Sequence, residues 1–496
     1  MDFSPDDFTT ETEAPWSHRE QLRTGTRLAG TEPCSRIGVV VSWPRIRPNQ
    51  MKKSITRLTL IIALCAPPVV AQQSLDAMID RELPQLVSTY KMLHAAPELS
   101  HYEVKTSAFL AQQLRALGYE VTENVGKYEK SEWKGHGVVA VMKNGAGPTV
   151  LVRSDMDALP VEEQTGLAYA STVKTKNDAG QEVSVMHACG HDVHITSLIG
   201  TATMLARLKD QWRGTLVLIG QPAEETIDGA KAMLADGLYS RIPKPDYTIA
   251  LHDSADLEAG KVSYAPGYAM ANSTSVEVTI RGLGGHGSKP EATKDPIVVA
   301  AQVILALQTI VSRENSPLDP AVVTVGSIHG GAKSNIIPDE VKMLLTVRSY
   351  KEEVRKRILA SIERITKNIA AAAGIPDDRA PIVKASETEM TPALYNDPQL
   401  TERVAKTLRE TLGADNVVQI PPIMASEDFG RLSLDQQIPS VLFNLGAVEP
   451  EKVAASKQSG KPLPSLHSSK FLPVAEPTIR TAIIGMTTAV MELMKK

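Results

Sequence analysis

Residues 186–194 read Met-His-Ala-Cys-Gly-His-Asp-Val-His, and the rest of the fold can be read outward from this stretch. It places one thiol, three imidazoles and one carboxylate within nine residues. Thiolate and imidazole both bind borderline metal ions, and Gly190 lets Cys189 and His191 turn toward one point. The alternative is a buried free cysteine beside surface histidines. We favour a metal site built on Cys189 and His191.

The first 71 residues are set apart by their composition. Met51, Lys52 and Lys53 form a second apparent start, and a largely apolar run over 58–70 ends at Ala71. A charged head, an apolar middle and a small-residue exit predict a signal peptide over 51–71 and a secreted, bacterial periplasmic protein. We interpret residues 1–50, polar and without periodicity, as an upstream extension that is not translated or is disordered. The alternative is a cytoplasmic leader before a buried helix.

Removal of the leader changes the cysteine count. Cys34 and Cys65 leave with it, so Cys189 has no disulfide partner. In an oxidising compartment an unpaired thiol favours metal ligation further.

Length and charge exclude several classes of protein. Without its first 71 residues the 496-residue chain keeps 425, enough for two domains. The net charge is −4, and the leader holds 9 Lys and Arg against 7 Asp and Glu, so about −6 remains. Without a basic stripe, and with 4% aromatic residues, nucleic-acid binding is not expected. The apolar run of the leader is shorter than the roughly 20 residues of a membrane span, so no span is predicted.

Apolar strands alternate with helices over the first half of the mature chain. We predict neighbouring strands at 138–142 and 149–152, then a helix at 195–208, a strand at 215–219, a helix at 229–239 and a strand at 247–251. Continuous apolar strands between helices indicate an α/β fold whose mostly parallel sheet is covered on both faces.

Polar side chains follow three of these strands. They are Asp155 and Asp157, then Glu224 and Glu225, then His252 and Asp253. Sheets of this kind bind ligands beyond the carboxyl ends of their strands, so we predict that these groups meet at one edge.

The pattern changes between residues 270 and 383. There we predict a strand at 274–280, a helix at 295–312, strands at 322–328 and 340–347, and a helix at 351–373. The helix at 295–312 is apolar almost all round, so we expect it to be buried. This α+β module is predicted to interrupt the first domain, whose sheet would resume with a strand at 381–385, a helix at 398–412, a strand at 440–444 and a helix at 475–494. Residues 171–185 are predicted to form a polar hairpin and 449–464 a surface loop.

Eight motifs occur in order along the chain: residues 153–160, 186–194, 221–225, 251–252, 284–286, 335–338, 426–429 and 466–468. Together they resemble the M20 metallopeptidase family, in the amidohydrolase branch that includes hippurate hydrolases, N-acyl-amino-acid amidohydrolases and indoleacetyl-amino-acid hydrolases. The resemblance covers residues 75–494. It implies a two-metal catalytic domain, residues 72–269 and 384–496, interrupted by a smaller lid and dimerisation domain, residues 270–383, and hence a homodimer.

The resemblance also assigns the metal ligands. It makes Cys189, His191, Glu225, His252 and His467 the ligands of two divalent ions, with Cys189 bridging or lying between them. The chemistry agrees, because a metal pair lowers the pKa of a shared water and holds the oxygens of a tetrahedral intermediate. The thiolate favours zinc, and a carboxylate-rich site also suits manganese, cobalt or nickel.

The resemblance assigns the remaining roles as well. Glu224 would be the general base that deprotonates the attacking water and then protonates the departing amine. His286, commonly supplied by the partner subunit in related enzymes, would stabilise the oxyanion. Asn335 and Arg348 match positions that hold the substrate carboxylate.

Five further groups are predicted to support the ligands from behind: Asp157, Asp155, His187, Asp192 and His194. The expected substrate is a small N-acyl amino acid with a free carboxylate, or a short peptide. Two alternatives stay open. One is a carboxypeptidase or dipeptidase on the same scaffold, and the other is a non-catalytic binding protein that kept the fold.

Overall fold

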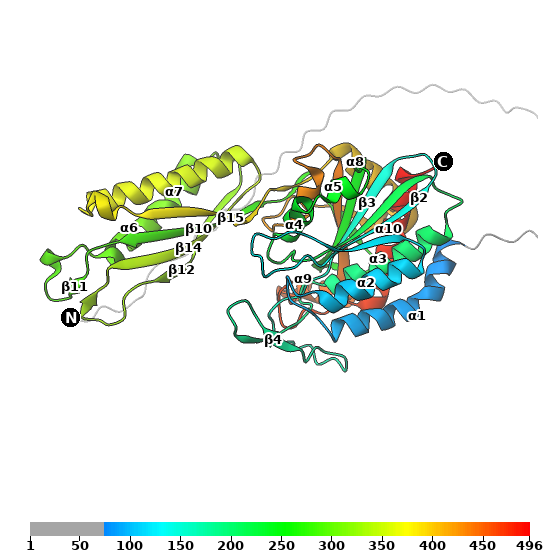
Figure 1. Cartoon of the computed structure of the whole chain (residues 1–496), viewed down its shortest axis with the longest axis horizontal. Coiled ribbons are helices and arrows are strands. Elements are labelled where there is room, and N and C mark those ends of the chain that lie inside the picture. The colour runs from blue at the N-terminus through cyan, green and yellow to red at the C-terminus, as the bar shows by residue number, and fades with distance from the viewer. Residues whose placement is uncertain (1–73) are drawn as a thin grey trace, which may run out of the picture. The chain divides into compact units, whose positions relative to one another are not determined.

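The computed structural model describes residues 74–496 of the chain. The extension predicted over residues 1–50 and the signal peptide predicted over 51–71 lie outside the described residues. The described residues belong to one compact unit. Figure 1 shows a larger part around one sheet and a smaller part, here called the lid, that carries α6 and α7.

An eight-stranded sheet runs through the larger part, in the order β1-β2-β6-β3-β7-β18-β8-β17. The central strands β6, β3, β7 and β18 are parallel. The pairs β1–β2, β2–β6 and β18–β8 are antiparallel, and the edge strand β17 runs parallel to β8. This sheet confirms the predicted α/β fold with a mostly parallel sheet. In chain order its strands are β1 (Glu120–Val125), β2 (Gly137–Asn144), β3 (Thr149–Asp155), β6 (Gly214–Gln221), β7 (Tyr247–Glu258), β8 (Val262–Tyr264), β17 (Val417–Gln419) and β18 (Ser440–Val448).

Both faces of this sheet are covered. Val150 and Val152 point into one hydrophobic core and Leu151 into the other, as alternation along a strand requires. The first core packs under α1 (Leu75–His94), α2 (Val104–Ala116), α3 (His191–Arg207), α8 (Pro398–Leu412) and α10 (Ala475–Leu493). The second lies under α4 (Gly229–Ala235), α5 (Leu238–Arg241) and the 3-10 segment Asp428–Ser433.

Two details of the predicted larger part are wrong. The strands β2 and β3 are not neighbours, because β6 lies between them, antiparallel to β2 and parallel to β3. The short turn between β2 and β3 suggested that they pair directly. Instead β6, which is buried from Leu216 onward, pairs with both of them. The helix predicted over 229–239 is broken at Gly237, whose φ of 77° ends one helix and begins the next.

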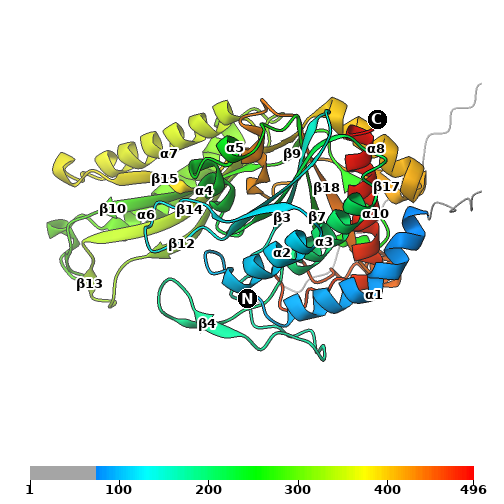
Figure 2. The same ribbon diagram turned by 45° about the vertical axis from the view of Figure 1, so that its right-hand side comes forward.

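The lid is a four-stranded sheet in the order β12-β14-β10-β15 with two helices. Its elements are β10 (Asn272–Arg281), α6 (Pro296–Thr309), a π-helical turn (Ile310–Glu314), β12 (Ala321–His329), β14 (Glu340–Ser349), α7 (Glu352–Ala372) and β15 (Ile382–Thr391). Both helices contribute to one hydrophobic core with the sheet (Figure 2). Residues 381–385 were predicted to rejoin the main sheet, but β15 pairs with β10, so the lid sheet continues to Thr391.

The expectation that helix 295–312 is buried is also wrong. Val299, Val303 and Leu307 enter the lid core, but Val298 is 54% exposed and Leu305 73% exposed. An apolar helix therefore presents one apolar face outward. By length and composition alone, residues 296–314 could cross a membrane. This is weak evidence for a membrane span, because the core helices of other proteins pass the same test.

The remaining elements are short. The predicted hairpin over 171–185 is confirmed as β4 (Lys174–Lys176) and β5 (Glu182–Ser184). Two further ribbons pair β9 (Gly267–Met270) with β16 (Leu394–Asn396) and β11 (Gly285–His286) with β13 (Ile336–Ile337). Single 3-10 turns span Pro290–Ala292, Asp377–Arg379 and Ala414–Asn416. The predicted loop over 449–464 is partly helical, because it contains α9 (Pro450–Ser459). Proline at the first position and Gly460 just after the last residue favour a helix with these ends.

Candidate metal centre and active site

A pocket of about 1700 Å³ opens between the main sheet and the lid. Its floor includes the loop after β6 and Cys189, just before α3, and its roof includes Ser273 of β10 and Arg348 of β14. His252 lines it from within β7, because that strand continues to Glu258 instead of ending at Leu251. The predicted edge of the parallel sheet is therefore the wall of one large pocket.

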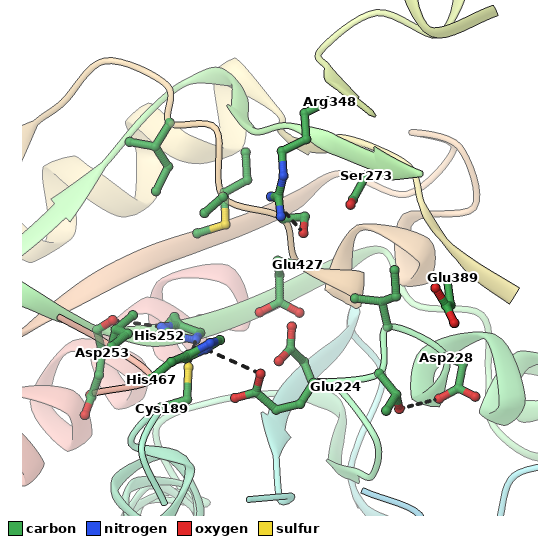
Figure 3. Close-up of a pocket in the computed structure, with 18 of the residues that line it drawn as sticks. Cys189, Glu224, Asp228, His252, Asp253, Ser273, Arg348, Glu389, Glu427 and His467 are labelled. Carbon is green, nitrogen blue, oxygen red and sulfur yellow. Dashed lines mark hydrogen bonds and ion pairs between the residues drawn. The ribbon is translucent and has the colours of Figure 1, made fainter. Parts of the chain in front are cut away.

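Four of the five predicted ligands, Cys189, Glu225, His252 and His467, line this pocket, and His191 lies buried beside Cys189 and His252. Figure 3 shows Cys189, His252 and His467 close together. The Cys189 sulfur lies 3.5 Å from His252 Nε2. His467 Nε2 lies 3.4 Å from one oxygen of Glu225, and His191 Nε2 lies 3.9 Å from the other. Ligand atoms of Cys189, His191 and His252 fall within 4.8 Å of one another, as do those of Cys189, Glu225 and His467. Two such overlapping groups are what a pair of cations with a shared thiolate requires.

The two buried imidazoles are oriented for metal ligation. His191 Nδ1 donates to the backbone carbonyl of Asp157 at 2.8 Å, and His252 Nδ1 donates to the carbonyl of Asp253 at 2.8 Å. Nε2 of each ring therefore carries the lone pair that faces the pocket. Among the described residues, His191 Nε2 and Glu225 Oε1 are buried without a hydrogen-bond partner. Buried polar atoms rarely stay unsatisfied, and a cation would satisfy both, so the residues fit a metal.

Unusual backbone conformations bring the ligands together. Gly190 has a φ of 80°, and a Cβ there would lie 2.3 Å from a carboxylate oxygen of Asp253. Only glycine fits between the two metal-binding residues of the cysteine stretch. His467 has a φ of 65°, and its N–H donates to the carbonyl of Ala188 at 2.8 Å. This bond joins the His467 loop directly to the cysteine stretch.

Glu224 and Glu225 lie on a compact turn between β6 and α4, residues 222–229, here called the catalytic loop. The φ angles of Ala223 (52°) and Ile227 (54°) are both left-handed. The Ile227 N–H donates to the carbonyl of Glu224 at 2.7 Å, and the Gly229 N–H to the carbonyl of Ala223 at 3.0 Å. Left-handed residues with a Cβ are strained, so surrounding contacts must hold the loop.

Buried carboxylates supply several of those contacts. Glu103, from the segment before α2, accepts the N–H of Ala223 at 2.7 Å. Asp157 accepts the N–H of Glu225 at 3.0 Å, and Asp428 accepts an N–H at the start of α4 at 2.9 Å. Asp157 thus orients two ligands, through its carbonyl and through its side chain. Neither Glu103 nor Asp428 was singled out from the sequence.

The site concentrates negative charge in a buried place. Burial raises the pKa of Glu224, and the carboxylates of Glu427 and Glu225 raise it further. Burial raises the pKa of Glu225 to about 7, and burial together with Glu225 raises that of the Cys189 thiol. Divalent cations would add positive charge among these acids and bring the ligands to their deprotonated forms.

Arg153 is a buried countercharge that the sequence reading did not assign. Its guanidinium lies 2.5 Å from Asp155 and 2.8 Å from Glu427, and its Nε donates to Gln221 at 3.0 Å. The signal was available, because Arg153 follows Val-Leu-Val in a strand predicted to be buried on both faces. A charge in such a strand has to be paired.

The other predicted supporting residues are all buried. Asp155 accepts from His194 Nδ1 at 2.6 Å, and Asp192 accepts from His94 Nδ1 at 2.7 Å. His187 is buried without a hydrogen bond to either ring nitrogen from the described residues, and burial lowers its pKa to about 4. His187 is therefore neutral at the working pH of most enzymes.

The lid residues divide into two groups. Arg348 lines the pocket and points toward Glu427 (Figure 3). His286 and Asn335 are exposed and are not among the residues that line the pocket. His286 lies on the β11–β13 ribbon, and the Gly287 N–H donates to the carbonyl of Asn335 at 2.9 Å. Figure 1 shows this ribbon at the end of the lid far from the main sheet, so the structure does not bring either residue to the metal centre of its own chain.

Comparison with known proteins agrees with this geometry. Residues 151–462 match peptidase family M20/M25/M40. Thermostable carboxypeptidase 1 of Saccharolobus solfataricus is 36% identical over 388 residues, which is 78% of this chain and 90% of that protein. Hippurate hydrolase of Campylobacter jejuni is 39% identical over 340 residues, which is 68% of this chain and 82% of the hydrolase.

A solved structure shows the same fold. The Bacillus subtilis YXEP protein, a dinuclear metal binding peptidase from the M20 family, aligns with a TM-score of 0.63 at 26% identity. The alignment covers 83% of this chain and 98% of that one. The family match spans more than half of the sequence and the relatives align over most of their own length, so the chain belongs to peptidase family M20/M25/M40 and is a hydrolase of amide bonds.

Proposed function

We propose that this hydrolase cleaves the amide bond between an acyl group and an amino acid that carries a free carboxylate. One observation supports this most directly: Arg348 lies in the same pocket as the metal ligands. Its Nη1 donates to the carbonyl of Met424 at 2.8 Å and to the hydroxyl of Ser426 at 3.2 Å. Both bonds use one nitrogen, so the other guanidinium donors remain for a planar carboxylate.

The relatives support the same substrate class. Hippurate hydrolase and N-acetyl-L-cysteine deacetylase are named for substrates that join an acyl group to an amino acid. Thermostable carboxypeptidase 1 is named for peptides, which also end in a carboxylate. N-acyl amino acids and peptides both carry a free carboxylate. They differ in the group on the other side of the amide bond that is cleaved.

The residues of this chain divide the reaction between them. Two divalent ions held by the five ligands would polarise the scissile carbonyl and activate water. Glu224 takes the proton of the attacking water and returns it to the departing amine. Arg348 fixes the far end of the substrate, so the amide is presented to Glu224 in one orientation.

We propose zinc as the resident metal, because a buried thiolate at the centre of the site favours it. Manganese, cobalt and nickel suit the carboxylate part of the site. Metal analysis of protein purified without added metal distinguishes them.

We further propose a homodimer in which His286 and Asn335 reach the pocket of the partner subunit. Support comes from their exposure on the β11–β13 ribbon and from the exposed apolar residues of the lid. An exposed histidine donor would stabilise the oxyanion only when the second subunit brings it there.

Arg348 gives the test of the substrate class. Arg348→Ala is expected to lower kcat/KM for N-benzoylglycine roughly 10- to 100-fold, because a charged hydrogen-bonded pair is lost. For N-benzoylglycinamide, which has no carboxylate, wild type and variant should be equally slow. Equal loss on both compounds would contradict a carboxylate-binding role.

A dipeptide with a free amino group separates the alternatives. If glycyl-glycine is cleaved faster than N-benzoylglycine, the protein is a dipeptidase on the same scaffold. Failure to cleave either compound after metal loading would contradict the proposed function.

A further inference from the structure

A stack of side chains links the catalytic loop to the loop between β1 and β2. The Trp133 ring lies flat on the imidazole of His101, with centroids 3.6 Å apart and planes 7° apart. Tyr128 packs edge-on against the same imidazole at 4.9 Å. His101 is only 4% exposed, so the two rings fix its position.

The far edge of this imidazole binds the catalytic loop. His101 Nε2 lies 3.1 Å from a carboxylate oxygen of Asp228. The same oxygen accepts the hydroxyl of Thr226 at 2.8 Å, and Figure 3 shows this bond beside Glu224. His101 and Asp228 both line the pocket, and neither was singled out from the sequence.

The position of this contact matters because of Ile227. A β-branched residue with a φ of 54° is a genuine outlier, and it tends to relax to a negative φ. Such a change would rotate the peptide units that follow Glu225 and displace both glutamates. The start of the loop is held by Glu103 and Asp157, whereas Asp228, just after Ile227, is held from outside the loop by His101.

We propose that His101 is a positioning residue. Its imidazole holds Asp228 in place. Asp228, together with Thr226, then holds Ile227 in the left-handed conformation. That conformation keeps Glu224 and Glu225 at the metal centre. Trp133 and Tyr128 act one step further away by fixing the imidazole. The inference rests on the proposed role of Glu224 as the base.

The strain itself provides the test. Glycine adopts a φ of 54° without penalty, so Ile227→Gly removes the need for an outside support. His101→Ala is expected to lower kcat at least tenfold and to change KM less than about threefold, since Arg348 is untouched. Adding Ile227→Gly to His101→Ala should restore kcat to that of the Ile227→Gly single variant.

Hydrogen exchange of the metal-free protein gives a readout that does not depend on activity. The amides of Ile227 and Gly229 are bonded within the catalytic loop, so a peptide covering residues 222–230 should exchange at least tenfold faster in His101→Ala. His329→Ala, which removes an exposed histidine of the lid, is the control and should match wild type in both measurements.

The outcomes separate the two hypotheses. Wild-type kcat and exchange in His101→Ala, or a double variant as slow as His101→Ala, overturns the positioning role. If wild type cleaves dipeptides instead of N-acyl amino acids, the substrate proposal fails, and the same five proteins compared on a dipeptide still test His101. If Glu224→Gln keeps its turnover, the assignment of Glu224 as the base fails. The hydrogen-exchange measurement then tests by itself whether His101 holds the catalytic loop.

Discussion

Glu224 and Glu225 are identical neighbours in the sequence, yet each meets a different environment. Glu225 lies 3.4 Å from His467 and is oriented through its own N–H by Asp157. Glu224 is buried and feels the charge of Glu427. Successive side chains on a tight left-handed turn point in different directions, so one glutamate can ligate while the other remains free for proton transfer.

Glu224→Gln is the direct test of that division. The amide keeps the shape but cannot accept a proton, so kcat should fall roughly 100- to 10,000-fold. Metal content, measured by plasma mass spectrometry, should stay at the wild-type level. Glu225→Gln is the matched comparison, and it should lose metal as well as activity. Unchanged turnover in Glu224→Gln would contradict the mechanism.

His94 predicts a pH dependence of stability. It bonds Asp192 at 2.7 Å and Glu163 at 3.0 Å in a buried place. Burial alone lowers its pKa, but the two carboxylates raise it to about 9. A raised folded pKa means that the contribution is complete below the unfolded value of about 6.5 and is lost as pH rises through about 9.

The free energy of unfolding should therefore fall between pH 6.5 and pH 9, by roughly 3 kcal/mol at most from this residue. Denaturant titrations of wild type and His94→Gln over that range measure it, and the slope should flatten in the variant. His329→Gln, on the exposed lid surface, should keep the wild-type slope. Equal slopes for wild type and His94→Gln would contradict the assignment.

At the scale of elements, the catalytic loop is the most constrained connection in the site. A Cβ at Gly229, the first residue of α4, would lie 1.6 Å from the carbonyl oxygen of Pro222. The loop can close between β6 and α4 only because this position has no side chain.

Gly229→Ala should therefore open the loop. We expect a loss of stability of about 1–3 kcal/mol or more and a loss of turnover larger than that stability change explains. Thermal unfolding and kcat measure the two effects. Gly326→Ala in β12 is the control, because the nearest atom to its new Cβ would be 3.9 Å away. A Gly229→Ala protein that keeps its activity would show that the loop tolerates a wider shape.

The helix α6 shows how an element can be misread. Its sequence is apolar on all sides, and apolarity alone predicted burial. One side packs on the lid sheet, and the other carries the exposed Val298 and Leu305. An exposed apolar face of this kind is more typical of an interface than of a core.

At the scale of the whole molecule, the pocket is built from both parts of the chain, and part of the predicted machinery lies elsewhere. Arg348 reaches the pocket because β14 runs toward the main sheet. His286 and Asn335 lie on the ribbon at the other end of the lid (Figure 1). A homodimer that exchanges these residues would complete both sites.

Mixed dimers test the exchange. Glu224→Gln and His286→Ala homodimers should each be inactive. A heterodimer of the two has one site with an intact Glu224 and an intact His286 from the other subunit, so a reassembled equal mixture should recover about a quarter of wild-type activity. If each chain used its own His286, the mixture would stay inactive. Sedimentation of the wild-type protein checks that the dimer exists.

The five predicted ligands come together in the structure. A thiol and an imidazole two residues apart pointed to a metal locally, so Cys189 and His191 could be read from their own stretch, whereas the resemblance assigned Glu225, His252 and His467. Arg153 and Glu427 lie in two of the eight motifs but received no role, because each depends on a partner 274 residues away. His101 and Asp228 were missed for the same reason, as nothing in the sequence links them.

The sequence by itself determined the α/β class, the family and the residues that converge on the metal centre. These follow from short-range patterns, namely apolar strands, motif spacing and donor chemistry. Only the tertiary structure decided that β6 lies between β2 and β3, that β15 belongs to the lid and that α6 keeps an apolar face exposed. It also decided which buried charges pair and which backbone angles are strained. Pairing across a sheet, burial of a helix face and neutralisation of a charge depend on contacts between distant segments, and local sequence does not encode those contacts.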